Sequence, residues 1–372
     1  MKRILLFLLL FFWILWANLD WNSKLSEVQG YVTVIESLTP QKNSLRNVIA
    51  IQPFMVESDY LLKERFQRKM EIYLEKSKES GFIGKFSIVL LPEYLGTWLV
   101  IQNEKTSIAK SSSLMFAMLQ LILSNPFRFI EFFPESKSDE DRIASTLFRS
   151  KAKLMARTYQ ETFSYLARKY NVYISAGSIV LPDPRISDNQ IQINPKGKLQ
   201  NSSFLFLPDG SIHPHIVKKV FPIESEKPFI TPSNLETIAK FPLEIGQIGI
   251  LICADSWYPE PYKKLQGAEL VLVNSYCAQD GSMNMIWKGY SGAETPSDID
   301  LKDIGRIKEK EAWMKYSLPG RIHLSRARHG VLVFLRGHLW NLGSDGYPIF
   351  VSEGKLLNPT PTDKAGIYQM AF

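Results

Sequence analysis

The sequence predicts a protein of the α/β class, in which strands and helices alternate along the chain. Asn47–Pro53 and Phe86–Leu91 are short apolar runs of the length of a buried strand. Between them, Tyr60–Lys78 carries apolar residues at helical spacing, separated by lysine and glutamate. A strand, a helix and a second strand in this order favour a sheet with parallel neighbours. A further apolar run begins at Gly246 and stops abruptly at Cys253, which predicts a buried strand that ends at a thiol.

The alternation continues toward the C-terminus. The further helices that we expect are Ser150–Tyr170, Tyr262–Gly267 and Leu301–Tyr316. The further strands are Val172–Val180, an antiparallel set at Gln190–Ile193 and Ser202–Leu207, then Ile216–Phe221 and Leu270–Asn274. A loop is expected over Ser275–Ser297, a helix end and a strand over His323–Arg336, and a hairpin over Asn341–Phe350.

The composition is ordinary for a globular protein. Of the 372 residues, 45% are hydrophobic and 22% are charged, so the chain can build a sizeable core. The net charge is +7, but the basic residues are scattered and no nucleic-acid-binding motif is present. We therefore expect no nucleic-acid partner, and the basic balance fits an anionic membrane better. Cys253 and Cys277 lack ligand-spaced neighbours, so we expect no metal; they could pair in an oxidising compartment.

The N-terminus carries a topological signal. Lys2 and Arg3 precede Ile4–Leu19, a stretch without a charged residue. Because no good small-residue cleavage site lies near its end, we predict an uncleaved signal anchor over residues 1–20; cleavage and secretion are the alternative. The basic residues place the N-terminus inside, so the protein is expected to be single-pass with its catalytic domain outside the cytoplasm. Residues 21–46 are then a connector, and residues 47–372 form one domain.

The segment Ser113–Phe133 is mostly apolar and aromatic and is interrupted at Asn125-Pro126. One interpretation is a pair of core helices. The other is an amphipathic lid that rests on a membrane. The sequence leaves both open.

The polar residues after Cys253 give this thiol a chemical interpretation. Asp255, Ser256 and Pro259 break the apolar run directly behind it. An apolar strand that ends in a polar loop is the geometry that holds a nucleophile at a strand tip, with a rigid backbone and a partly open approach. The alternative is that Cys253 is a small buried hydrophobic residue, as most free cysteines are.

Three motifs together resemble the carbon–nitrogen hydrolase (nitrilase) superfamily. They are Leu90–Glu93, a strand that ends in a carboxylate; Val217–Pro222, a strand that carries lysine; and Ile250–Glu260, the cysteine strand. The resemblance extends from Val48 to the C-terminus. It implies a four-layer α-β-β-α sandwich and, commonly, a homodimer or a larger assembly.

The resemblance implies a catalytic triad of Glu93 as general base, Lys219 as the lysine and Cys253 as the nucleophile. A cysteine near its ordinary pKa is only slightly ionised at neutral pH, so a carboxylate that takes its proton would activate it. A neighbouring ammonium would lower the thiol pKa and stabilise an oxyanion, as would a backbone N–H just after Cys253. The implied reaction is acyl transfer through a thioester, which needs no metal or organic cofactor.

Several residues keep alternative roles. Glu93 could cap a turn beside Pro92, and Lys219 could be a surface lysine. Strand alternation puts Lys218 and Lys219 on opposite faces, so only one can point inward; we choose Lys219 and keep Lys218 as the alternative.

The remaining site expectations are less direct. A second glutamate is expected after the lysine, at Glu226 rather than Glu224. Asp255 is expected to orient the turn behind the nucleophile. Tyr94, Trp257 and Cys277 are candidate pocket residues by position, with simple packing as the alternative.

Three functions are compatible with these motifs. The first is a membrane-anchored amidase-type hydrolase that acts on a small amide or nitrile, with lipid-linked substrates also open. The second is an N-acyltransferase, similar to apolipoprotein N-acyltransferases, that passes the acyl group to an amine; those proteins carry several spanning helices, and this chain offers one. The third is a catalytically inactive binding protein, against which the intact triad argues.

Overall fold

Two β-sheets stacked against each other form the centre of the structure, a computed structural model that describes residues 4, 11–16, 25–39 and 46–372. The first sheet has the order β1 (Val32–Ser37), β17 (Ala365–Ala371), β2 (Arg46–Gln52), β4 (Phe86–Leu90), β5 (Tyr173–Pro182), β8 (Leu199–Phe206), β9 (Val217–Lys218). The second has the order β10 (Lys240–Leu243), β11 (Gly246–Ile252), β12 (Leu270–Ser275), β13 (His329–Phe334), β15 (Ile349–Ser352), β16 (Lys355–Leu357). Two small sheets pair β3 (Phe54–Val56) with β14 (Arg336–His338) and β6 (Arg185–Ser187) with β7 (Gln190–Gln192).

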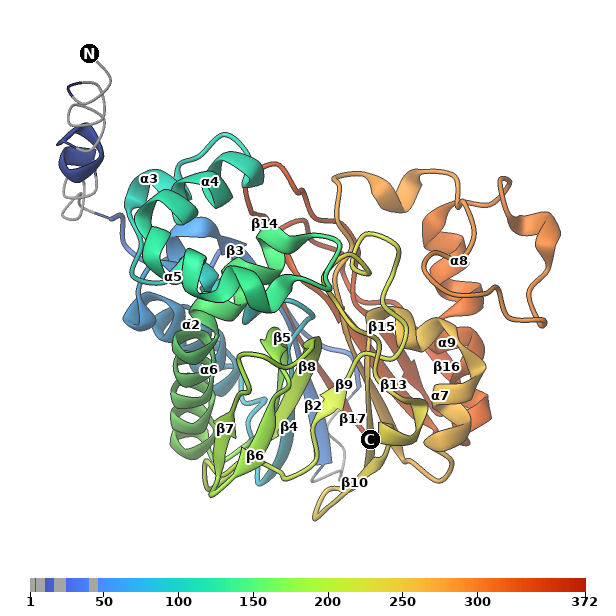
Figure 1. The fold of residues 1–372 in the computed structure, drawn as a ribbon. Coiled ribbons are helices and arrows are strands. Elements are labelled where there is room, and N and C mark those ends of the chain that lie inside the picture. Colours follow the sequence, from blue (N-terminus) through green and yellow to red (C-terminus); the bar gives the residue numbers. More distant parts are fainter. Residues whose placement is uncertain (1–3, 5–10, 17–24, 40–45) are drawn as a thin grey trace.

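Helices cover the outer faces of both sheets, which completes the predicted α-β-β-α layering (Figure 1). On the first sheet lie α2 (Lys63–Glu79) and α6 (Arg142–Tyr170), and on the second lie α7 (Pro259–Lys264), α8 (Glu309–Tyr316) and α9 (Leu318–Arg321). Three short helices, α3 (Thr106–Ala109), α4 (Leu114–Ser124) and α5 (Pro126–Phe132), connect β4 to α6 at one end of the molecule.

Strand β2 shows how the layers are held together. Its side chains alternate between faces, so Ile49 and Ile51 pack toward the helices of the first layer. Val48 and Ala50 point the other way and join the core that includes the second sheet. All four side chains are buried, which is why Val48–Ile51 is a continuous apolar run rather than an alternating one.

The long helix α6 has local signals at both ends. The Asp141 side chain accepts hydrogen bonds from the backbone N–H groups of Ile143 and Ala144, which caps the N-terminus. Asn171 ends the helix in the left-handed conformation, with φ of 52°. The helix begins before the predicted Ser150 because residues 142–149 continue its buried face.

The ends of the chain differ from the sequence predictions. Strand β1 lies inside the segment 21–46, which was expected to be a connector, and it pairs with β17 in parallel. The structured domain therefore begins before residue 47. The predicted hairpin at Asn341–Phe350 is instead the β15–β16 pair, and the predicted helix Leu301–Tyr316 is regular only over α8.

The two interpretations of Ser113–Phe133 can now be compared. The segment does form two helices, α4 and α5, as both interpretations require. However, α4 buries only Ala117 and Leu121, and α5 buries no residue. They are therefore not a pair of core helices.

The predicted signal anchor, residues 1–20, lies mostly outside the described residues. Of this segment, residues 11–16 are helical. Within the part of the chain that the structure describes, no helix has both the length and the apolar character needed to cross a bilayer.

Candidate active site

The three predicted catalytic residues lie just beyond the ends of three strands. Glu93 follows β4, Lys219 follows β9 in the first sheet, and Cys253 follows β11 in the second sheet. All three are buried, with exposed fractions of 1%, 2% and 7%. The stacking of the two sheets brings the three strand ends to one point between the layers, which the sequence spacing alone cannot show.

Lys219 is the centre of the polar cluster. Its Nζ donates to Glu93 Oε1 at 2.7 Å and to Glu226 Oε1 and Oε2 at 2.9 and 2.7 Å. The three contacts match the three donors of an ammonium group. Lys218, the alternative lysine, is half-buried and belongs to none of these contacts, and Glu224 instead pairs with Lys227 at 3.1 Å.

Cys253 sits on a sharp turn. Its φ is 44°, a left-handed conformation that is uncommon for a residue other than glycine, and a short 3₁₀ helix, Cys253–Trp257, begins there. The Sγ atom donates to the backbone oxygen of Tyr276 at 3.6 Å, and the Glu93 carboxyl is close enough to raise the pKa of the thiol. A strained strand-to-helix turn that presents a nucleophile is a recurring feature of acyl-transfer sites.

A close approach of two backbone segments fixes the turn that carries Glu93. Gly177 has φ of +72°, and a Cβ atom there would lie 2.2 Å from the Pro92 carbonyl oxygen, so only glycine fits. Next to it, Ser178 Oγ accepts the backbone N–H of Tyr94 at 2.8 Å. Asn201 Nδ2 donates to Glu93 Oε1 at 2.8 Å and holds the carboxylate from the side of β8.

Asp255 connects the nucleophile turn to the lysine segment. Its Oδ1 accepts the backbone N–H groups of Val220 and Phe221 at 3.0 and 2.8 Å. The predicted orienting role of Asp255 therefore extends across the two sheets, because this carboxyl holds the residues that directly follow Lys219. Burial raises the pKa of Asp255 to about 7.

The raised pKa of Glu93 makes it a stronger base than an ordinary glutamate, although the pKa of the Cys253 thiol lies higher still and the proton rests on sulfur. Burial, together with Glu226, raises the pKa of Glu93 to about 7 against the opposing influence of Lys219. Burial lowers the pKa of Lys219, but Glu226 and Glu93 outweigh it and the net pKa is raised, so the ammonium stays charged. Burial and then Glu93 raise the pKa of Cys253. Lys219 does lower the pKa of the Cys253 thiol, as expected, but burial and Glu93 outweigh the ammonium and the net pKa is raised.

A pocket of about 380 Å³ opens onto Cys253. Of the three candidate pocket residues, Trp257 and Cys277 line it, whereas Tyr94 instead donates a hydrogen bond from its hydroxyl to Glu226. The walls are mainly aromatic and apolar, and they include Tyr258, Tyr276, Met285, Ile286, Trp287, Tyr290 and Trp313. Most of these residues come from the long loop after β12. The two cysteines of the chain are both free thiols.

Sequence reasoning missed two residues of the cluster. Asn201 lies in the middle of β8, and nothing local marks it as a partner of Glu93. Tyr276 follows β12, the parallel neighbour of β11, and its backbone oxygen faces the thiol. The rule that ligands gather beyond the carboxyl ends of parallel strands would have found Tyr276.

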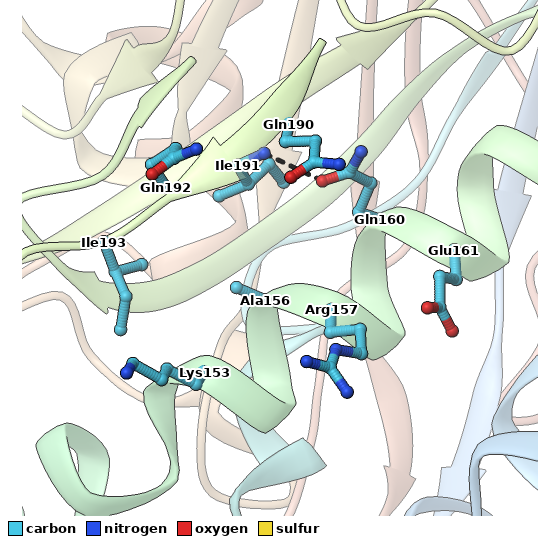
Figure 2. Close-up of a pocket in the computed structure, with 9 residues that line it drawn as sticks. All are labelled: Lys153, Ala156, Arg157, Gln160, Glu161, Gln190, Ile191, Gln192 and Ile193. Carbon is cyan, nitrogen blue, oxygen red and sulfur yellow. Dashed lines mark hydrogen bonds between the residues drawn. The ribbon is translucent and has the colours of Figure 1, made fainter. Parts of the chain in front are cut away.

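A second pocket lies between α6 and the β6–β7 hairpin (Figure 2). It is lined by Lys153, Arg157, Gln160 and the hairpin, and Gln160 Oε1 accepts the backbone N–H of Ile191 at 2.8 Å. None of the three predicted catalytic residues lines it, whereas Cys253 lines the pocket described above.

Comparisons with known proteins support this picture. No curated protein sequence is significantly similar to the chain. Among solved structures, a cysteine-to-serine mutant of the Nesterenkonia AN1 amidase from the nitrilase superfamily matches with a TM-score of 0.53 and 14% identity, over 88% of this chain and 92% of that one. The same amidase from Nesterenkonia sp. AN1, in complexes with acrylamide and with butyramide, matches with TM-scores of 0.52, 14% identity and coverage of 89% and 91%.

These structures show a shared fold. The family model for carbon-nitrogen hydrolase matches residues 66–295, which is more than half of the chain and includes Glu93, Lys219 and Cys253. The chain belongs to the carbon–nitrogen hydrolase family.

Proposed function

We propose that this protein is an amidase-type hydrolase that breaks a carbon–nitrogen bond through a thioester on Cys253. The observation that carries the proposal is the buried contact network of Glu93, Lys219 and Glu226, which meets the thiol at the base of the pocket. A buried lysine between two carboxylates is costly to maintain for stability alone, because desolvation opposes the gain from pairing. Its position beside a thiol on a strained turn supports a catalytic use.

The first half of the reaction forms the thioester. Glu93 accepts the proton of Cys253, and Sγ attacks the carbonyl carbon of the amide. The negative charge that develops on the carbonyl oxygen is stabilised by the Lys219 ammonium and by the backbone N–H of Ala254, in the first turn of the 3₁₀ helix. Glu93 then returns the proton to the nitrogen, the carbon–nitrogen bond breaks, and the amine leaves.

The second half consumes water. Glu93 accepts a proton from a water molecule, whose oxygen attacks the thioester carbon. The carbon–sulfur bond breaks, the thiol regains its proton, and a carboxylic acid leaves. Glu226 keeps Lys219 in place through both halves, because it holds the ammonium through both carboxylate oxygens.

The pocket lining favours substrates with an apolar or aromatic acyl group. Most of the lining is apolar or aromatic, Trp257, Trp287 and Met285 included, and Lys288 and Glu309 are charged groups among it. Apolar walls with a few polar groups select for shape and hydrophobic area. The Nesterenkonia amidase structures carry small amides, butyramide and acrylamide among them, and this chain is expected to take amides as well, or nitriles, with a larger acyl group.

An N-acyltransferase is the second candidate function, in which an amine replaces water in the second half of the reaction. The apolar pocket favours it, because such walls suit a fatty or otherwise lipid-linked acyl donor. The two candidates are separated by adding a primary amine to the assay. A transferase converts the acyl group into a new amide, whereas a hydrolase releases the acid.

We also propose that residues 1–20 anchor the enzyme in a membrane, with the catalytic domain outside the cytoplasm. The support is the uncharged stretch Ile4–Leu19 behind Lys2 and Arg3. The full chain should stay with the membrane fraction in alkaline carbonate. Release into the supernatant would contradict the anchor and leave the reaction untouched.

A panel of amides and nitriles tests the proposed reaction, with release of ammonia or amine as the readout. Cys253→Ala should abolish turnover, because the variant lacks the thiol that lies beside Glu93 and Lys219. Cys277→Ala is the matched control, since this second thiol lines the same pocket. Turnover that survives Cys253→Ala would rule out the proposal.

A further inference from the structure

Helices α4 and α5 present an apolar face to the outside of the protein. This face, which we name the α4–α5 face, consists of six exposed side chains: Met115 (72%), Phe116 (58%), Leu119 (47%), Leu123 (50%), Phe127 (79%) and Ile130 (67%). Those of α4 recur at helical spacing, so they form a continuous stripe. Monomeric proteins rarely expose a contiguous apolar patch without a use for it.

The opposite side of the same helices is apolar too. Ala117 and Leu121 are buried, and Met118, Ile122 and Phe129 pack against the core. Gln120, in the middle of α4, is tied to Ser107 and Ser111 by hydrogen bonds. A helix that is hydrophobic all round is expected in a protein interior or in contact with lipid, and one side of α4 has no protein cover in the described structure.

A second apolar segment contacts the C-terminal end of α4. In residues 11–16, Trp13 Nε1 donates to the backbone oxygen of Leu123 at 2.9 Å, and the Trp16 ring lies 3.9 Å below the Lys105 ammonium. Phe11, Phe12, Ile14 and Leu15 are exposed. The outer side of α4 therefore continues into the most apolar stretch of the whole chain.

We propose that the α4–α5 face inserts into the headgroup and upper acyl region of a phospholipid bilayer. The occupant is lipid because the face is continuous with residues 11–16, which belong to an uncharged stretch of sixteen residues, Ile4–Leu19, that only an apolar environment suits. Arg128 is exposed among the apolar side chains of α5, where a long basic side chain can reach the phosphates. Tryptophan residues such as Trp13 and Trp16 favour the same interfacial depth.

Helices α4 and α5 lie at the same end of the molecule as the long loop after β12, which lines the pocket at Cys253 (Figure 1). The backbone N–H of Leu114 donates to Asn341 Oδ1 at 2.9 Å, and the Tyr276 hydroxyl donates to the Gly343 oxygen at 2.7 Å. The short segment 341–343 thus links the start of α4 to the wall of the pocket. Docking of the face on a bilayer would keep the pocket near the lipid surface.

Photoactivatable phosphatidylcholine in vesicles tests the proposal on the full-length protein. After irradiation, lipid-labelled peptides are mapped by mass spectrometry. We expect labelling of peptides that cover residues 114–133 in addition to the N-terminal segment. The β16 peptide that contains Leu356 is the internal control, because this side chain is as exposed as Leu119, at 47%, and lies on another part of the surface.

Two variants sharpen the result. Phe116→Lys/Phe127→Lys should lose the labelling of residues 114–133 with an unchanged melting temperature, since both side chains are already exposed. Leu356→Lys should leave the labelling unchanged. Labelling confined to the N-terminal segment would overturn the proposal. So would a lipid-free dimer that the double variant separates into monomers, because the face would then bind a second copy. Neither readout depends on turnover.

Discussion

Lys219 Nζ lies 2.7 Å from Glu93 Oε1, and both side chains are 1% exposed. Such a pair, taken out of water, is stable only when its remaining hydrogen-bonding capacity is met. Glu226 accepts a further hydrogen bond from Lys219, and Asn201 donates one to Glu93. The cluster therefore holds an ionised carboxylate within reach of a thiol whose own pKa is raised by burial.

Removal of the buried ammonium should cost stability. Lys219→Met leaves Glu93 and Glu226 together without a cation, and breaking a buried pair in this way costs about 3–5 kcal/mol of unfolding free energy. Urea unfolding at pH 7.5 or so measures the loss. Without Lys219, which lowers it, the pKa of Glu93 should rise further above its unfolded value, so the penalty should be absent at low pH and grow as the pH rises through the unfolded pKa. A loss of unfolding free energy that does not change with pH would mean that Lys219 stabilises the fold through packing and not through its charge.

The activity should decline on the acid side of neutrality. Glu93 must be ionised to accept the Cys253 proton, and its pKa is raised to about 7, first by burial. The value of kcat/KM should therefore fall as the pH drops below about 7, with an apparent pKa that belongs to the coupled cluster. Glu93→Gln should lose about 10²–10⁴-fold of the activity. A fall in kcat/KM centred on the ordinary pKa of glutamate would contradict the assignment of Glu93 as the base.

The two thiols should respond differently to the loss of Glu93. Burial raises the pKa of Cys253, and burial raises that of Cys277 to about 11, so neither is a ready thiolate. With a base beside it, Cys253 should react with iodoacetamide faster than Cys277. Glu93→Gln should slow the labelling of Cys253 and leave Cys277 unchanged, as measured by peptide mass spectrometry. Equal rates in the wild type would count against an activated Cys253.

Asp255 should act as a positioning residue. Asp255→Ala frees the Val220 and Phe221 backbone and lets Lys219 drift from the thiol, and a misplacement of about 1 Å costs on the order of 10²-fold in kcat. Asp255→Asn keeps a carbonyl oxygen that can accept both N–H groups, so it should retain most of the activity. A purely electrostatic role for Asp255 would make the two variants equally poor.

Two exposed methionines, Met285 beside α8 and Met314 within it, allow a test of the pocket. Met285 lines the pocket at Cys253 and is 46% exposed, whereas Met314 is 39% exposed and lines a separate hollow beside Tyr347. Met285→Gln should raise KM for amides with a large apolar acyl group by about 10-fold and leave acetamide unaffected. Met314→Gln should change neither. Equal changes in KM for the two variants would mean that the acyl group does not bind in the pocket beside Met285.

The elements with strong local patterns could be predicted from the sequence. The apolar runs of β2, β4 and β12 and the helical spacing of α2 each specify one conformation, and the structure confirms them. Sequence reasoning missed strand β1, although Val32–Ile35 are all β-branched and its residues alternate between half-buried and exposed at the edge of the sheet. Its partner β17 joins it from the other end of the chain, and no local pattern reveals that pairing.

The same distinction holds for the candidate site: local patterns mark its residues, but not their proximity in space. Cys253 and Glu93 are marked by the strands that end before them, and Lys219 by its motif. The proximity of these residues depends on how two sheets stack, which is a matter of tertiary packing. The rise in the Cys253 pKa was missed for the same reason, because burial of the thiol is invisible in the sequence.

The most direct test of the thioester is the mass of the enzyme during turnover. The full-length protein is mixed with an amide that carries an apolar acyl group, quenched in acid within the first turnovers, and digested for peptide mass spectrometry. The peptide that contains Cys253 should carry the mass of the acyl group, and Glu93→Gln should abolish that adduct. An acyl group on Cys277, or product formation with no adduct at Cys253, would contradict the proposed mechanism.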